Sequence, residues 1–131
     1  MRVIICGGRD FTAVNSAWRA LDFLDRDLRI ATVIEGGAMG ADRVGREWAL
    51  ARQKQVITFP ADWENHGRKA GPIRNQEMID QGRPDAVVFF PGGRGTEDMV
   101  RRAKAADIRL IAMCVGDMPE ASGSQSSEES R

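Results

Sequence analysis

The chain has 131 residues, with 19 acidic and 19 basic side chains and therefore no formal net charge. This length fits one domain with a hydrophobic core, and no apolar run is long enough to span a membrane. Two cysteines in apolar runs, Cys6 and Cys114, and a lone histidine argue against a disulfide framework and against a metal site, so neither a metal nor another cofactor is predicted.

The apolar run at residues 3–6 is too short for a secretory signal peptide, and buried free cysteines suit a reducing compartment, so the predicted location is the cytoplasm. The charge is spread unevenly, because residues 116–131 carry a net charge of −3 and the remainder +3. This mild basic excess suits a small anionic ligand better than a long polyanion.

Short apolar runs alternate with amphipathic stretches, and this pattern predicts strands and helices in turn. In chain order they are a strand at 3–6, a helix at 13–27, a strand at 31–34, a helix at 39–53, a strand at 56–59, a polar loop at 61–71, a helix at 72–81, a strand at 86–90, a helix at 96–106 and a strand at 109–115. Pro72 suits a first helical turn, and Thr96 is predicted as an N-cap.

This order of elements is typical of an α/β protein. It predicts an open parallel sheet of about five strands with helices on both faces. The predicted domain comprises residues 1–115. Residues 116–131 are rich in Ser, Glu and Gly, which predicts a disordered tail.

Three predicted strands end in glycine-rich turns. The turns begin at Gly7 (GGRDF), Gly36 (GGAMGAD) and Pro91 (PGGRGT). Glycine lets a backbone approach an anion closely, and the free N–H groups of a helix start point toward it. Since open parallel sheets bind ligands beyond the carboxyl ends of their strands, the three turns predict one composite site for a nucleotide-like ligand.

These three segments and GPIRN, which begins at Gly71, occur in an order that resembles the YspA-related SLOG family of small bacterial and phage proteins. The family belongs to the superfamily of the Smf/DprA proteins and the Lonely Guy (LOG) phosphoribohydrolases. The resemblance extends over about residues 1–115. It implies a Rossmann-like fold and a ligand that is a nucleoside phosphate or an ADP-ribose-like molecule, bound by a sensor or a sequestering protein.

LOG-type enzymes instead cleave the N-glycosidic bond of a nucleoside 5′-monophosphate, and this is the alternative function. Arg74 and Met78 fit the R-x-x-x-M segment of those enzymes, but Met99 stands where they have a catalytic Glu. Glu97 and Asp98 are close to this position in the sequence, but successive side chains of a helix point about 100° apart. If the protein is an enzyme, the resemblance makes Arg74, Asp98 and Glu97 the candidate catalytic residues.

The turns and the start of the third long helix supply the predicted binding groups, which are Gly7, Gly8, Arg9, Asp10, Gly36, Gly37, Gly40, Asp42, Arg74, Asn75, Pro91, Gly92, Gly93, Arg94, Gly95 and Thr96. Arg74 and Arg94 are predicted to balance a phosphate. Asp10 and Asp42 either contact the ligand or cap helices.

Two roles are open for Glu35 at the end of its strand, which are a polar contact with the ligand and a solvated strand end. Trp63 either stacks a base or packs its loop against the core.

Nucleic acid is not an expected partner, because basic and aromatic residues are not interleaved, and no membrane partner is expected. The family resemblance implies a homodimer or a higher homo-oligomer, since LOG-type sites are completed by a partner subunit.

Overall fold

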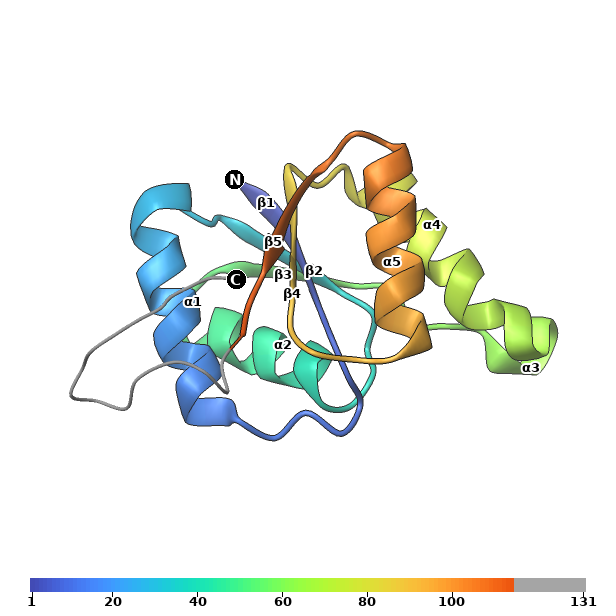
Figure 1. Ribbon diagram of the computed structural model, residues 1–131, viewed down its shortest axis with the longest axis horizontal. Coiled ribbons are helices and arrows are strands. Elements are labelled where there is room, and N and C mark those ends of the chain that lie inside the picture. The colour runs from blue at the N-terminus through green and yellow to red at the C-terminus, as the bar shows by residue number, and fades with distance from the viewer. Residues whose placement is uncertain (115–131) are drawn as a thin grey trace.

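The computed structural model describes residues 1–114, and its centre is a five-stranded parallel sheet with helices on both faces (Figure 1). The strands are β1 Arg2–Cys6, β2 Thr32–Glu35, β3 Gln55–Thr58, β4 Ala86–Phe89 and β5 Arg109–Ala112. Their order is β3-β2-β1-β4-β5, so the direction of winding reverses between β1 and β4. The predicted α/β fold class is confirmed. The predicted tail at 116–131 lies outside the described residues.

Two helices cover each face of the sheet. Helices α1 (Val14–Leu28) and α2 (Ala41–Ala51) lie on one side, and α4 (Ala70–Gly82) and α5 (Arg94–Ala105) on the other (Figure 1). Within residues 1–114 no helix has both the length and the apolar character that a membrane span requires.

The central strand β1 is buried on both faces because its apolar side chains alternate between them. Val3 and Ile5 pack with α1 and α2, whereas Ile4 and Cys6 pack with α4 and α5. The expected burial is confirmed for Cys6, whereas Cys114 is only partly buried.

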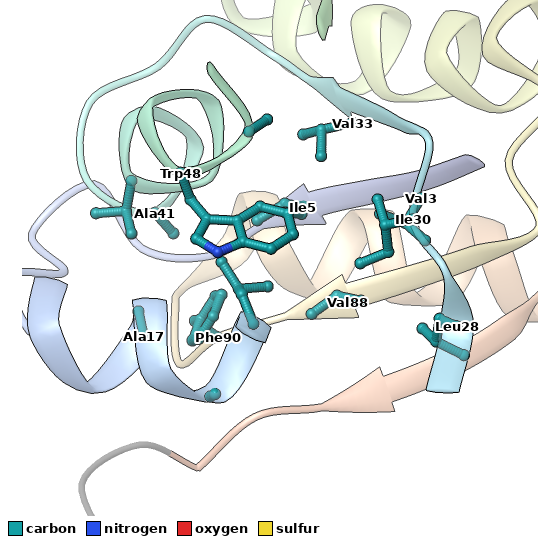
Figure 2. Close-up of a cluster of buried hydrophobic side chains, with 14 of the residues drawn as sticks. Val3, Ile5, Ala17, Leu28, Ile30, Val33, Ala41, Trp48, Val88 and Phe90 are labelled. Carbon is teal, nitrogen blue, oxygen red and sulfur yellow. The ribbon is translucent and has the colours of Figure 1, made fainter. Parts of the chain in front are cut away.

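Trp48 of α2 is the largest fully buried side chain. Its indole lies over the sheet beside Ile5 of β1, as Figure 2 shows. The indole N–H donates a hydrogen bond of 2.8 Å to Asp22 of α1, so this buried aromatic residue joins α2 to α1 and keeps its polar atom satisfied.

The strand register brings the glycine turns to one edge of the sheet. Cys6, the last residue of β1, pairs with Phe89, the last residue of β4, and Glu35 at the end of β2 pairs with Thr58. Because all neighbouring strands are parallel, the turns after β1, β2 and β4 emerge on the same side of the molecule.

The segment predicted as a loop at 61–71 contains two short helices, α3 (Trp63–His66) and the 3₁₀ helix η1 (Gly67–Lys69), and α4 already begins at Ala70. Asp62 explains the extra turn, because its carboxylate accepts hydrogen bonds from the backbone N–H of Asn65 at 3.2 Å and from Nδ2 of Asn65 at 2.7 Å. A local side-chain cap of this kind has no apolar period, so hydrophobic patterning does not detect it.

The N-cap predicted at Thr96 is wrong. Helix α5 begins at Arg94 with Gly93 as its N-cap, and Thr96 is buried in the first turn. The N–H of Glu97 donates to the Gly93 carbonyl at 3.0 Å, which closes that turn earlier than the side-chain pattern suggested.

Candidate functional site

The three glycine-rich turns surround one cavity of about 900 Å³ at the carboxyl edge of the sheet. The cavity lies where the strand order reverses, which is the usual ligand position in open parallel sheets. Most of the predicted binding residues line it, namely Gly7, Gly8, Arg9, Asp10, Asp42, Arg74, Asn75, Pro91, Gly92, Gly93, Arg94, Gly95 and Thr96.

Backbone hydrogen bonds join the three turns into one unit. The N–H of Gly8 donates to the Pro91 carbonyl at 2.8 Å, which ties the β1 turn to the β4 turn. The N–H of Ala41 donates to the Gly8 carbonyl at 3.1 Å, which ties the β1 turn to the start of α2. The β1 turn is therefore the centre of the site.

Gly36, Gly37 and Gly40 are not among the residues that line the cavity. They allow close packing behind it instead. A methyl group on Gly36 would lie 2.6 Å from Cζ of Arg74, and Gly37 and Gly40 have positive φ angles of 76° and 72°. Direct ligand contact by these three glycines stays a prediction.

The β4 turn presents an open helix start to the cavity. No side chain of residues 1–114 caps α5, so the N–H groups of its first turn are available to an acceptor. A methyl group on Gly93 or Gly95 would meet no described atom within 4 Å, whereas one on Gly92 would lie 2.7 Å from the Gly8 nitrogen. The turn is thus tightly packed behind and open in front.

Asp42 is a buried carboxylate on the cavity wall. It accepts hydrogen bonds from the N–H groups of Gly36 at 3.0 Å and Ala38 at 3.3 Å, so it holds the β2 turn in place. Burial raises the pKa of Asp42 to about 6. The Ala38 N–H, the positive charge of Arg74 and the Gly36 N–H act in the opposite direction, and the negative charge of Glu35 adds to the increase.

This raised pKa predicts that the free energy of unfolding falls as the pH rises from about 4 to about 6. In this range the native protein keeps a proton that the unfolded chain has already released. Asp42→Asn removes the titration and keeps an acceptor oxygen. We expect the variant to match the wild type near pH 4 and to exceed its free energy of unfolding by up to about 3 kcal/mol at pH 7.

Urea titrations at four pH values between 4 and 7 measure this difference. Asp10→Asn is the matched control, because it makes the same substitution at an exposed carboxylate on the same cavity. A constant offset between Asp42→Asn and the wild type at every pH would contradict the prediction.

Arg74 lies between α4 and the β2 turn. One guanidinium nitrogen donates to the Gly36 carbonyl at 2.6 Å, and Nε donates to Oδ1 of Asn75 at 3.1 Å. The guanidinium is therefore fixed beside Asp42 and faces the cavity. An arginine held in this way suits an anionic ligand, since little side-chain entropy remains to be lost on binding.

Asn75 and Asp98 form a buried polar link between α4 and α5. Nδ2 of Asn75 donates to Asp98 at 3.0 Å and to the Gly95 carbonyl at 3.2 Å. Asp98 also accepts from Arg101 and from Arg102, both at 2.8 Å. Asn75 thus uses its two amide hydrogens within the protein, and its geometry is that of a positioning residue.

The same partners control the ionisation of Asp98. Burial acts to raise its pKa, but the hydrogen bonds from Arg102 and Asn75 and the charges of Arg102 and Arg101 outweigh it and hold the pKa below the ordinary value. Asp98 is therefore a paired carboxylate that lines the cavity.

Met99 and Glu97, the other two positions considered for catalysis, do not line the cavity. Met99 is buried in the core between the sheet and the helices α4 and α5. Glu97 is exposed and lines a separate hollow of about 520 Å³ between α5 and the ends of β4 and β5. Only Asp98 of these three contributes to the cavity.

Glu35 is not a solvated strand end, because its side chain is fully buried. It accepts hydrogen bonds from the N–H of Gly37 at 2.7 Å and from the Thr58 hydroxyl, and it pairs with Arg46 at 3.4 Å. The sequence indicated Glu35 as a residue of interest because it lies at the end of a predicted strand. Its contact with Thr58 arises only from the pairing of β2 with β3.

Arg68 is a cavity residue that the sequence reasoning missed. It belongs to η1, and with Arg9, Arg74 and Arg94 it gives the cavity four guanidinium groups. The basic pair Arg68–Lys69, close before Pro72, was the available signal. Among the described residues no group of His, Cys, Asp and Glu side chains is arranged to hold a metal ion.

Fold and site together define a Rossmann-like domain with three glycine-rich turns around an arginine-rich cavity. The chain belongs to the YspA, cpYpsA-related SLOG family, whose profile matches residues 1–66. It is 41% identical over 126 residues to the Gene 61 protein of Mycobacterium phage D29, and the match covers 90% of this chain and 98% of that protein. No solved structure gives a significant match.

Proposed function

We propose that the protein binds a nucleotide-derived ligand in this cavity and acts as a sensor or a sequestering protein. The observation that carries the proposal is the convergence of three glycine-rich turns on one cavity at the point where the strand order reverses. Membership of a SLOG family supports a nucleotide-related ligand.

A phosphate fits best at the turn from Gly92 to Thr96. The first N–H groups of α5 and the positive end of its helix dipole favour an anion there. Arg74 and Arg94 line the same cavity and supply positive charge for the phosphate.

The size of the cavity supports a nucleoside phosphate or an ADP-ribose-like molecule. Its volume of about 900 Å³ is near the upper end of the usual range for small-molecule sites, which is roughly 300–1,000 Å³. A free phosphate or a small sugar phosphate would leave most of this space to water.

Ligand-observed proton NMR of the purified protein tests the proposal. The probes are AMP, other nucleoside monophosphates, NAD and ADP-ribose. We expect saturation transfer to at least one of them without new free-base signals over hours. The proposal would be contradicted if none of these compounds received saturation transfer from the protein.

Gly92→Ala tests the position of the phosphate. The added methyl group would meet Thr96 and would lie 2.7 Å from the Gly8 nitrogen, so the turn must shift. We expect the dissociation constant of the bound nucleotide to rise by about tenfold or more, as measured by calorimetric titration. Gly67→Ala adds the same methyl group outside the cavity, where no described atom lies within 4 Å. Equal affinity of both variants would refute the placement.

Hydrolysis of an N-glycosidic bond is the second candidate function. It is favoured by the buried carboxylate of Asp42 beside Arg74 on the cavity wall, a pair that can stabilise a developing positive sugar and an anionic leaving group. The same NMR samples decide the point, because growing free-base signals that vanish in Arg74→Ala would establish an N-glycosidase.

A further inference from the structure

The indole of Trp63 lies on the wall of the cavity although nothing in the core holds it there. Trp63 begins α3 and is 50% exposed, and it belongs to neither of the two hydrophobic core clusters. All residues of α3 and η1 are exposed. The interpretation that Trp63 packs its loop against the core is therefore wrong.

Two neighbours keep the indole at the cavity. The guanidinium carbon of Arg9, in the turn after β1, lies 5.6 Å from the centroid of the indole ring. A methyl group placed on Gly71, at the start of α4, would lie 3.6 Å from Cη2 of Trp63. Trp63, Arg9 and Gly71 all line the same cavity.

The contact between Arg9 and Trp63 is of a kind that a ligand can replace. Both side chains are exposed, and a cation over an aromatic ring is weak where water reaches it. Stacking of a nucleic-acid base on an aromatic side chain is the stronger interaction and tolerates any base, since every base has a π face. A released Arg9 would remain beside the cavity, free to pair with an anion.

We propose that Trp63 forms a second subsite of the cavity, which stacks the planar aromatic base of the ligand after Arg9 leaves the indole face to pair with the ligand's phosphate. The inference rests on the proposed function and makes it more specific. It assigns the wall at Trp63 to the base and the turn at Gly92 to the phosphate. A ligand that carries both groups should therefore bind more tightly than a sugar phosphate, which can occupy only the phosphate site.

The test compares a ligand that carries a base with one that lacks it. AMP, GMP, CMP, UMP and ADP-ribose are titrated into the full-length protein by calorimetry, and ribose 5-phosphate is the probe without a base. Trp63→Leu removes the ring and should weaken the binding of the base-bearing ligands by about tenfold or more, while ribose 5-phosphate binds as to the wild type. Trp63→Phe keeps a ring and should retain most of the affinity.

Two further readouts separate stacking from a general effect on the fold. Tryptophan emission should be quenched when AMP is added to the wild type and unchanged when it is added to Trp63→Leu. Phe23→Leu is the matched control, because Phe23 is an exposed aromatic residue of α1 outside the cavity, and it should bind every ligand as the wild type does. Arg9→Ala should weaken AMP and ribose 5-phosphate alike.

The outcomes are distinct. If Trp63→Leu binds AMP as tightly as the wild type, or loses AMP and ribose 5-phosphate equally, the base subsite is refuted and the phosphate site stands. If Arg9→Ala leaves both ligands unchanged, the exchange of Arg9 is refuted. If the wild type binds none of the nucleotides, the proposed function fails, and this inference fails with it.

Discussion

Gly40→Ala is expected to lower the free energy of unfolding by about 3 kcal/mol. Gly40 has a φ angle of 72°, which side chains other than glycine rarely adopt. A methyl group there would press on the Gly8 carbonyl oxygen and would lie 2.5 Å from the Arg9 carbonyl oxygen. Both are backbone atoms in the central turn of the site, so no side-chain rotation relieves the contact.

The measurement is urea-induced unfolding followed by circular dichroism. Gly67→Ala is the control, because Gly67 also has a positive φ angle, 54°, but a methyl group there would meet no described atom within 4 Å. It should cost only the backbone strain, about 1 kcal/mol. Equal losses in both variants would show that strain alone acts and that the β1 and β2 turns do not press on each other at Gly40.

Asp98→Ala is expected to lower the free energy of unfolding by about 2–3 kcal/mol at pH 7. The change leaves Arg102 without its carboxylate at 2.8 Å and Asn75 with one of its two acceptors, in a link that is largely buried. Since the α4–α5 link also positions the start of α5, the binding of a nucleotide should weaken in the same variant.

The pH dependence provides the check. The pKa of Asp98 is lower in the native state than in the unfolded chain, so its contribution is present above the unfolded value of about 4 and is lost as the pH falls through the native value. The difference between the wild type and Asp98→Ala should therefore shrink in acid. Glu97→Ala, an exposed neighbour on the same helix, should stay close to the wild type throughout.

These two variants also separate a structural from a catalytic role. If Asp98 is a catalytic residue of a hydrolase, Asp98→Ala should lose base release and keep its stability. If Asp98 is a positioning residue, Asp98→Ala should lose stability and nucleotide binding together, as the pairing of Asp98 with Arg101, Arg102 and Asn75 indicates. Stability of Asp98→Ala equal to that of the wild type would favour the catalytic interpretation.

Local patterns in the sequence were enough to predict the order of the long elements and the three glycine-rich turns. Strand β1, for example, is a short apolar run bounded by Gly7, and α2 repeats apolar residues at Val44 and Trp48. Such signals lie within a few residues of one another, so no tertiary information is needed to interpret them. Two of the failures were also local, since the Asp62 carboxylate caps α3 and the Gly93 carbonyl closes the first turn of α5, and neither contact has an apolar period.

The α/β class and the glycine-rich edge of the sheet could therefore be predicted from local sequence patterns. The role of each polar residue at that edge depends on long-range contacts. Arg74 meets the carbonyl of Gly36, 38 residues away in the chain, and Asn75 meets Asp98 over a separation of 23 residues. Burial and pairing set the ionisation of a carboxylate, and both arise only when α2, α4 and α5 pack around the carboxyl ends of the strands.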